Sequence, residues 1–483
     1  MQNPLEKFAE FTNIKTLTEA SAKPLRKSIR VNTLKSTAQE VQKWGAELGW
    51  TLSTVPWCAE GFFVERTDES ALGKDLLHQI GHIYLQEAAS MLPVALLDPK
   101  PNETILDLCA APGSKTTQIA AKMQNTGVII ANDVQEKRIW TLRGALQRSG
   151  VINTILTDKK GEWFGKQMTE CFDRVLCDAP CSALGVLRKD PDAAKFLTPK
   201  HIEKLKQTQL RLLEAAIHAT KIGGRIVYST CTLTPEENEG VVMETLMKFS
   251  GKLEILDERL AMSDERLAKF DIATQDSFVV QKYLHNQNPS FQLIANRLPL
   301  VRLWPQTYDT EGFFCAVLEK KGRTRDVLPM EDFREERKEL RPSRQEQITN
   351  ELTKRYGTAF MRKEEVLHEL GEHMVLTNTA VARFTFAAER YAFGLPFVKV
   401  QKDGRNRLTQ ELITFRGNEA TLFFVDLTEK QAEDILAGKD TACDPSLYGE
   451  MILRYKNLPI GLGMVKEGTI KNWLPRRVLQ QIA

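Results

Sequence analysis

Short apolar runs alternate with amphipathic segments through the middle of the chain, from about residue 102 to residue 320. The runs TILDLCA, GVIIAND, NTILT, DRVLCD and RIVYST have the length and β-branched content of buried strands. Segments between them, such as SKTTQIAAKM and HIEKLKQTQLRLLEAAIHATKIGG, have the apolar spacing of helices, and the second ends at a double glycine. This alternation predicts an α/β fold with a doubly wound, mainly parallel sheet, in which ligands bind beyond the carboxyl ends of the strands.

The regions on either side of this alternation have different patterns. The first hundred residues mix helix and strand signals, and YLQEAASMLPVALLD, residues 84–98, predicts a helix leading into the sheet. Residues 320–347 are highly charged, which indicates a linker or surface helix. Glycine-punctuated apolar runs then predict a small β-rich module. We therefore expect an N-terminal region over 1–95, a central domain over 96–320, a charged connector over 321–385 and a C-terminal domain over 386–483.

Composition and charge restrict the classes of function. Hydrophobic residues make up 42% and charged residues 27% of the 483 positions, which is typical of a globular protein. The net charge is only +3, so binding to nucleic acid would need local basic clusters. Residues 23–35 carry five basic residues and no acid, and residues 451–483 carry six basic residues against one acid. The first of these runs is either a solvated surface or a nucleic-acid contact.

The N-terminus and the cysteines indicate a cytoplasmic protein. The opening MQNPLEKFAEFTNIK has no long apolar run, so we expect neither a signal peptide nor a membrane span. Eight cysteines in a chain of this length do not form a disulfide framework of the kind found in small secreted domains. A reducing cytoplasm is the simplest compartment, and there a thiol stays available for chemistry.

A turn with one glycine follows the first strand of the sheet, in LDLCAAPGSKTTQIA. It lacks the G-x-G-x-x-G of dinucleotide sites and the first glycine of a P-loop. Asp133 ends the next strand, about 20 residues further on, where an acid can accept both ribose hydroxyls. This combination favours a nucleoside without a pyrophosphate, and S-adenosylmethionine is the obvious candidate. The alternative is an ordinary strand–helix turn.

Two cysteines and an acid follow the later strands. Asp178 ends one strand and Cys181 lies three residues beyond it, while Cys231 ends the next strand. Metal binding by Cys177 and Cys181 is disfavoured because no histidine lies near either, and zinc sites usually gather four ligands. Free cysteine is often a small buried hydrophobe, and this is the expected role of Cys58, Cys171, Cys177, Cys315 and Cys443. The third interpretation is nucleophilic catalysis, in which a thiolate adds to carbon 6 of a pyrimidine and makes carbon 5 nucleophilic.

The stretch after Cys231, TLTPEENEG, predicts the start of a helix. Thr234 can cap it, Pro235 suits the first turn, and two carboxylates then face the positive helix end. The same positive end would favour a thiolate at Cys231.

Three motifs in this order resemble the RNA cytosine-C5 methyltransferases, which include bacterial ribosomal RNA enzymes and eukaryotic nucleolar enzymes. The motifs are CAAPGSKTTQ, DAPCS and YSTCTLTPEENE, and SIRVNTLK and YLQEAAS resemble the N-terminal region of the family. The resemblance implies a Rossmann-like class I methyltransferase sheet, an α+β N-terminal region and, on PIGLGMVKEGTIKNWLPRR, a PUA-like RNA-binding domain. A scaffold role without RNA contact remains open for that last domain.

The resemblance also assigns roles to residues. It implies that Cys231 is the nucleophile, that Cys181 assists release of the product and that Asp178 holds the pyrimidine. The positions that match cofactor-binding residues of the family are Cys109, Ala110, Ala111, Pro112, Gly113, Ser114, Lys115, Asp133 and Asp178.

The chain departs from the family pattern at two positions. The family has glycine after PCS, where this chain has Ala183, so the backbone there is more restricted. A further cofactor-binding acid is expected in the loop TDKKGEWFG, but the matching position is Lys160. Asp158 is the nearest acid and is the predicted substitute.

We therefore expect an S-adenosylmethionine-dependent enzyme that methylates carbon 5 of a cytosine in RNA. The expected target is a decoding-site cytosine of 16S ribosomal RNA, and the enzyme is expected to be a monomer with no metal and no membrane partner. One alternative is a methyltransferase for transfer RNA or for several ribosomal RNA sites. Another is a weakly active RNA-binding ribosome assembly factor, which the two departures keep open.

Overall fold

The structure of the protein is a computed structural model that describes residues 5–66, 71–190, 198–256, 300–327, 340–386, 392–475 and 479. Part of the predicted charged connector, 328–339, and the last two arginines of the basic C-terminal stretch, Arg476 and Arg477, lie outside these residues. Within them, no helix has both the length and the apolar character needed to span a membrane.

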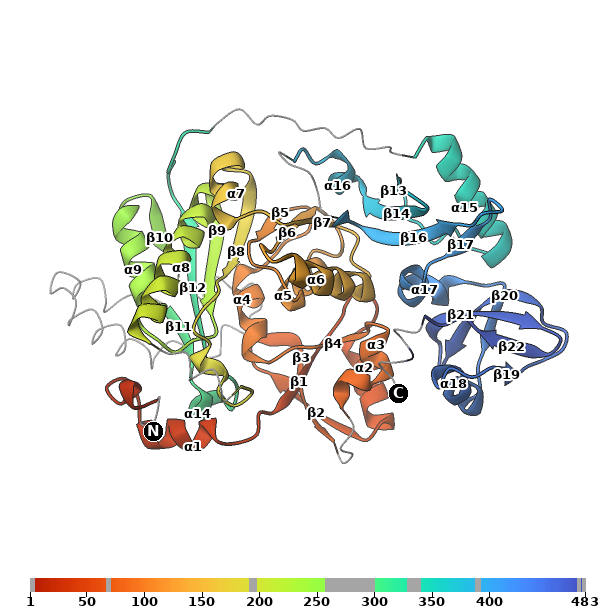
Figure 1. Cartoon of the computed structure of the whole chain (residues 1–483), viewed down its shortest axis with the longest axis horizontal. Coiled ribbons are helices and arrows are strands. Elements are labelled where there is room, and N and C mark those ends of the chain that lie inside the picture. Colours follow the sequence, from red (N-terminus) through yellow and green to blue (C-terminus); the bar gives the residue numbers. More distant parts are fainter. Residues whose placement is uncertain are drawn as a thin grey trace.

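A nine-stranded sheet lies at the centre of the described part of the molecule (Figure 1). Its order is β10-β12-β9-β8-β5-β6-β7-β15, and β11 pairs with β12. The strands are β5 (Thr104–Asp107), β6 (Val128–Asn132), β7 (Thr154–Thr157), β8 (Phe172–Asp178), β9 (Thr220–Thr230), β10 (Leu253–Ile255), β11 (Leu300–Leu303), β12 (Phe313–Lys320) and β15 (Ala392–Phe393). Strands β5 to β9 are parallel to one another, so the predicted doubly wound sheet is confirmed.

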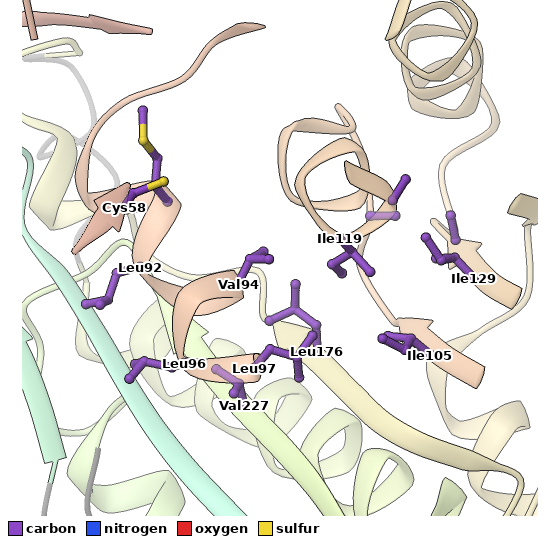
Figure 2. Packing of buried hydrophobic residues seen from close by; sticks show 14 of the residues in the cluster. Cys58, Leu92, Val94, Leu96, Leu97, Ile105, Ile119, Ile129, Leu176 and Val227 are labelled. Atoms are coloured by element: carbon purple, nitrogen blue, oxygen red, sulfur yellow. The ribbon is translucent and has the colours of Figure 1, made fainter. Parts of the chain in front are cut away.

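Helices cover both faces of this sheet and bury a separate apolar core on each. One face carries α4 (Leu92–Leu97), α5 (Ser114–Lys122) and α6 (Glu136–Ser149), and the other carries α7 (Gly161–Gln167), α8 (Pro199–Ala219) and α9 (Glu239–Lys248). Successive strand residues point to opposite faces, so Ile105 packs in the first core and Leu106 in the second. Figure 2 shows the first core, where Leu96 and Leu97 of α4 lie over Leu176 and Val227.

The N-terminal region is a four-stranded antiparallel sheet with the order β2-β3-β1-β4. Its elements are α1 (Ile14–Ser21), β1 (Lys27–Val31), α2 (Ala38–Glu47), β2 (Trp50–Val55), β3 (Cys58–Arg66), α3 (Leu76–Gln79) and β4 (Ile83–Leu85). The predicted helix over residues 84–98 is wrong at its start. Tyr84 belongs to β4, because it pairs with Arg30 of β1, and helical structure begins only at Ala89.

Two basic residues of the run 23–35, the buried Arg30 and the half-buried Lys35, make hydrogen bonds that stabilise the fold. The Arg30 guanidinium donates hydrogen bonds to Gln86 Oε1, to the carbonyl of Ser114 and to Thr117 Oγ1, and so ties β1 to helix α5. The Lys35 ammonium donates to the carbonyls of Ile80 and Arg148. Neither residue is therefore a solvated surface group or a free RNA contact. Through these two residues, the run joins the N-terminal region to the central domain.

The predicted end of helix α8 at the double glycine is also wrong. The helix ends at Ala219, and β9 begins at Thr220 and includes both glycines. The register between β8 and β9 shifts in this segment, where Gly223 has φ of +81°. The expected turn is therefore an irregular part of β9. The additional residues of β9 bulge out between two paired positions, and β9 stays paired with β8 on both sides.

The C-terminal part contains two further sheets. The first, in the order β13-β14-β16-β17, comprises β13 (Glu365–Leu370), β14 (His373–Asn378), β16 (Leu395–Val400) and β17 (Asn406–Leu408). The second, in the order β18-β20-β21-β22-β19, comprises β18 (Phe424–Asp426), β19 (Thr441–Ala442), β20 (Gly449–Tyr455), β21 (Leu458–Lys466) and β22 (Thr469–Asn472). The helices are α15 (Pro342–Tyr356), α16 (Thr379–Arg383), α17 (Gln410–Arg416) and α18 (Glu429–Leu436). The predicted β-rich module is confirmed, and the segment predicted as a charged connector contains α15, β13, β14 and α16.

The C-terminal part also completes the edge of the central sheet. Strand β15 pairs antiparallel with β7, so that Ala392 lies opposite Leu156. The side-chain amide of Asn378 donates to the carbonyls of Asn125 and Gly127, just before β6. Two segments separated by some 250 positions therefore share one hydrogen-bonded edge, which the sequence pattern does not indicate.

Candidate active site

Two thiols meet beyond the carboxyl ends of neighbouring parallel strands. Cys231 follows β9 directly, and Cys181 lies three residues beyond the end of β8. The two strands are paired with Asp178 opposite Ser229, so their following loops lie side by side. The sulfur atoms of Cys181 and Cys231 are 3.3 Å apart, which is a thiol hydrogen-bond distance and much longer than a disulfide bond. The structure thus brings together the two cysteines that the motifs single out.

The Cys181 thiol is held in its protonated form. The hydrogen bond to Cys231, followed by burial, raises the pKa of the Cys181 thiol well above its ordinary value. Cys181 therefore keeps its proton, and its sulfur lies within hydrogen-bond distance of the Cys231 sulfur. This position suits Cys181 as a proton donor to a group on Cys231.

Asp178 forms an ion pair with Lys115, in which the lysine is buried and the carboxylate is half-buried. Its Oδ2 is 2.7 Å from the ammonium of Lys115, and its Oδ1 accepts a hydrogen bond of 2.7 Å from Ser229 Oγ. Lys115 also donates to Ser90 Oγ at 3.0 Å. Burial lowers the pKa of Lys115, but the interaction with Asp178 outweighs this effect, and the pKa of the lysine is raised. Lys115 is therefore charged, and it connects the first loop of the sheet to the strand end that precedes Cys181.

The loop from Cys109 to Lys115 joins β5 to α5 and has the shape of a ligand cradle. Gly113 has φ of +112°, and a Cβ atom there would lie 3.1 Å from Leu142 Cδ1 and 3.0 Å from Ala145 Cβ. Gly113 is also the N-cap of α5 and offers no side chain, so the first amides of the helix remain available to a ligand. Glycine is required at this position both by the backbone and by the packing.

Two buried acids border this cradle. Asp133 follows β6 and is only 3% exposed; its carboxylate accepts from the amide of Gln135 and pairs with Arg138 at 2.9 Å. Asp107 ends β5, and burial raises its pKa to about 7, although its bond from Thr116 Oγ1 acts in the opposite direction. The other oxygen of Asp107 has no hydrogen-bond partner among the described residues. A loop with uncapped helix amides, flanked by acids at two strand ends, fits a nucleoside with a charged amino-acid tail.

The two departures from the motif pattern lie at the rim of the site. Asp158 follows β7, its side chain is 46% exposed, and it pairs with Lys159 at 3.5 Å, while Lys160 is the N-cap of α7. Strand β7 is next to β6, so Asp158 lies at the strand end adjacent to Asp133, and its contact with the cofactor stays a prediction. Ala183 adopts φ of 58° in the left-handed region, where glycine costs nothing and alanine costs about 1 kcal/mol. The backbone therefore keeps the glycine-type conformation despite the alanine.

The predicted helix start after Cys231 is wrong. Residues 235–238 form a turn, and α9 begins only at Glu239, with Asn238 as its N-cap. The Thr234 hydroxyl donates to the carboxylate of Glu237 and does not cap the helix. Helix α9 therefore begins eight residues beyond Cys231, and its positive end is not the neighbour of the thiol that the sequence predicts. The contact that the structure shows at the Cys231 sulfur is the one with the Cys181 sulfur.

Sequence reasoning missed a loop that supports Cys231 from the opposite side. The amide of Gly312 donates to the carbonyl of Gly185, and the amide of Gly185 donates to the carbonyl of Cys231, both at 2.9 Å. The neighbouring Glu311 is 2% exposed, and its two carboxyl oxygens have no hydrogen-bond partner among the described residues. Burial, and then the nearby Glu87 carboxyl, raise the pKa of Glu311 to about 8. Glu311 and Gly312 stand directly before β12, and the sequence around them has no pattern that indicates a contact with the Cys231 loop.

The raised pKa of Glu311 predicts that the protein loses stability as the pH rises from about 5 to 8. The folded form binds the proton more tightly than the unfolded chain, whose ordinary value is 4.5, so the stabilisation present at low pH disappears as the pH approaches 8. Glu311→Gln is expected to be more stable than the parent at pH 8, by at least about 2 kcal/mol, and similar to it near pH 5. Urea unfolding at both pH values measures this difference. A variant that differs equally at the two pH values would contradict the assignment.

Family models match three consecutive parts of the chain. Residues 94–319 match the 16S rRNA methyltransferase RsmB/F model, residues 1–88 the N-terminal domain of 16S rRNA methyltransferase RsmF, and residues 423–479 the RsmF PUA domain. The matched PUA segment contains the second C-terminal sheet, from β18 to β22. The family resemblance of the motifs is thereby confirmed.

Curated proteins and solved structures agree with these matches. "Ribosomal RNA small subunit methyltransferase F" of Psychromonas ingrahamii is 34% identical over 95% of this chain and 92% of its own length, and that of Klebsiella pneumoniae is 35% identical over the same shares. A crystal structure of a methyltransferase homologue from Pyrococcus horikoshii is 32% identical, with a TM-score of 0.54 over 66% of this chain and 99% of its own. NSun6 from the same organism, solved with SFG, shares the fold at 23% identity, with a TM-score of 0.55 over 67% of this chain and 98% of its own. The chain therefore belongs to the family of ribosomal RNA small subunit methyltransferase F, a family of S-adenosylmethionine-dependent methyltransferases.

Proposed function

We propose that this protein methylates carbon 5 of a cytosine in 16S ribosomal RNA, at the decoding site, through a covalent adduct with Cys231. The observation that carries the proposal is the contact of 3.3 Å between the Cys181 and Cys231 sulfurs, beside the Asp178–Lys115 ion pair. Two thiols and a carboxylate at adjacent strand ends supply the nucleophile, the proton donor and the base-holding group that carbon-5 chemistry needs. We place the reaction in the cytoplasm, where these thiols stay reduced.

The cofactor would be held by the cradle described above. The loop from Cys109 to Lys115 and the amides of α5 would bind its amino-acid end, and Asp133 would accept the ribose hydroxyls. Asp158 would border the adenine. When bound, S-adenosylmethionine supplies an electrophilic methyl group.

The positions of Cys231, Asp178 and Cys181 suggest the part that each plays in the proposed reaction. Cytosine leaves its stack and enters the crevice at the ends of β8 and β9. The Cys231 thiolate would form a bond to carbon 6 while N3 takes up a proton from solvent, and Asp178 would accept hydrogen bonds from N3–H and from the amino group. Carbon 5 would then bond to the methyl group, and the electrons of the broken sulfur–methyl bond would stay on the cofactor sulfur. N3 would lose its proton again when the methylated base is released. Loss of the carbon 5 proton to a base restores the ring double bond and expels Cys231, and Cys181 assists this release from its place beside the sulfur.

Bisulfite sequencing of total RNA tests the target. A strain that lacks the gene is expected to lose protection at one cytosine of 16S RNA, and the wild-type gene restores it, because 5-methylcytosine resists conversion. The Cys231→Ala gene is the matched control and restores nothing. Loss of protection in transfer RNA or at several ribosomal RNA positions would support the broader enzyme instead. An unchanged pattern would leave only an RNA-binding assembly factor.

A further inference from the structure

A buried carboxylate lies between the two cysteine loops. Glu237, in the turn before α9, is completely buried. Its Oε1 accepts from the Ser182 amide and from Gln209 Nε2, both at 2.9 Å. Its Oε2 accepts from the hydroxyls of Ser182 and Thr234, both at 2.5 Å. In the part of the chain that the structure describes, no basic side chain forms an ion pair with Glu237.

The four donors come from both sides of the thiol pair. Ser182 directly follows Cys181, and Thr234 belongs to the loop of Cys231. Gln209, on α8, also donates to the carbonyl of Pro180 at 2.9 Å, so Cys181 is held through the residues on both of its sides. The hydroxyls of Ser182 and Thr232 lie 2.8 Å apart and close the network.

Only a carboxylate can gather this set of donors. An ionised carboxylate accepts hydrogen bonds on two oxygens and donates none, whereas an amide has one accepting oxygen and an NH₂ group. A glutamine at position 237 would replace one accepting oxygen by an NH₂ group. That group would face either the Ser182 amide and Gln209 or the hydroxyls of Ser182 and Thr234. Burying a carboxylate without a cation is costly, and the bonds to its charge, which are stronger than neutral ones, offset that cost.

We propose that Glu237 is a positioning residue that holds the Cys181 thiol against the Cys231 sulfur, so that release of the methylated base depends on it. This inference rests on the proposed function, because it assigns Glu237 to the release step. The negative charge of Glu237 also contributes, after the bond to Cys231 and burial, to the raised pKa of Cys181. Glu237 thus influences both the position of the Cys181 thiol and its pKa.

Glu237→Gln in the full chain, incubated with 16S RNA and S-adenosylmethionine, is the direct test. The covalent protein–RNA adduct is expected to form at close to the parent rate but to resolve about a hundredfold more slowly, the usual effect of displacing a positioned group. The adduct then accumulates on denaturing gels as it does with Cys181→Ala, and kcat falls while kcat/KM stays close to the parent value, because kcat/KM reports only the steps before release. In the Cys181→Ala background, Glu237→Gln is expected to add no further defect in release.

Two neighbouring glutamates are matched controls. Glu236 is exposed, so Glu236→Gln should behave as the parent. Glu239 is buried in an ion pair with Arg302 and has no hydrogen bond to the Cys181 loop, so Glu239→Gln should lower the melting temperature without trapping RNA. If Glu237→Gln does not fold, Ser182→Ala removes one donor hydroxyl and allows the same comparison.

The outcomes separate this inference from the proposed function. Adduct formation and release that decline together, in proportion to the loss of folded protein, would make Glu237 a support of the fold only. Release at the parent rate would also overturn the inference. Failure of Cys181→Ala itself to trap RNA, with the Glu237 variant behaving likewise, would instead overturn the proposed reaction.

Discussion

Cys231→Ala is expected to abolish methylation and to form no covalent RNA adduct, whereas Cys181→Ala is expected to trap the adduct and stop turnover. The reason is the different position of the two thiols and the raised pKa of Cys181. Cys231 follows the end of β9 and is the proposed nucleophile, while Cys181 retains its proton and lies 3.3 Å away. Without Cys181, carbon 6 is still attacked and carbon 5 still receives the methyl group, but release is slow. Loss of a positioned proton-transfer group costs about 10²–10⁴-fold in rate.

Denaturing gel electrophoresis with labelled RNA measures both variants in one experiment. The label should migrate with the Cys181→Ala protein and not with Cys231→Ala. Cys177→Ala is the matched control, because this thiol is buried within β8 in the apolar core and has no role in the proposed reaction. Equal trapping by both variants would contradict the assignment of roles. Trapping by Cys231→Ala alone would reverse it.

Asp178→Asn is expected to reduce methylation by at least about a hundredfold, because the proposed contact with cytosine N3 and amino group is lost in a preorganised site. The same change leaves the Lys115 ammonium buried without its carboxylate, which costs roughly 3 kcal/mol of stability. The double variant Asp178→Asn, Lys115→Met removes the unpaired charge and is expected to recover most of this stability. Its activity is expected to remain as low as that of Asp178→Asn.

Thermal or urea unfolding, with steady-state methylation assays of the same preparations, checks both parts. Recovery of stability without recovery of activity shows that the loss of activity does not follow from loss of folded protein. Lys115→Met alone is assayed beside it, because Lys115 belongs to the predicted cofactor loop. If activity returns together with stability, Asp178 has no direct part in holding the base. Ser229→Ala, which removes one hydroxyl donor and leaves the carboxylate and its ion pair in place, should show a smaller loss in both assays.

The central sheet and its strand ends could be predicted because each strand is an apolar run bounded by polar or glycine residues. From these strand ends, the convergence of Asp178, Cys181 and Cys231 followed directly, since parallel neighbours end at one edge. The roles of the two cysteines could not be derived this way. They came from the resemblance of the motifs to a family, and they remain predictions.

Features that depend on distant contacts could not be predicted. Pro235 and Glu237 have the local pattern of a helix start, but the carboxylate of Glu237 is used by Ser182 and Gln209, which are distant in sequence. Arg30 belongs to a run that reads as a basic surface, yet its partners on α5 bury it. In each case the local pattern was sound, and a tertiary hydrogen bond overrode it.

Strand β15 and Asn378 join the C-terminal part to the sheet edge at β6 and β7 by backbone and amide hydrogen bonds. Hydrogen bonds from Tyr356 to Glu450 and from Gln410 to the carbonyl of Ile460 then join this part to the PUA-matched sheet. The distance between the paired cysteines and that sheet is therefore set by tertiary contacts and not by the length of a linker. Such a protein would select RNA by the distance between two contact points. An RNA that contacts both parts must present its target base and its second contact at one fixed spacing, as a folded RNA does and a flexible single strand does not. Selection by distance would then complement the chemistry proposed at Cys231.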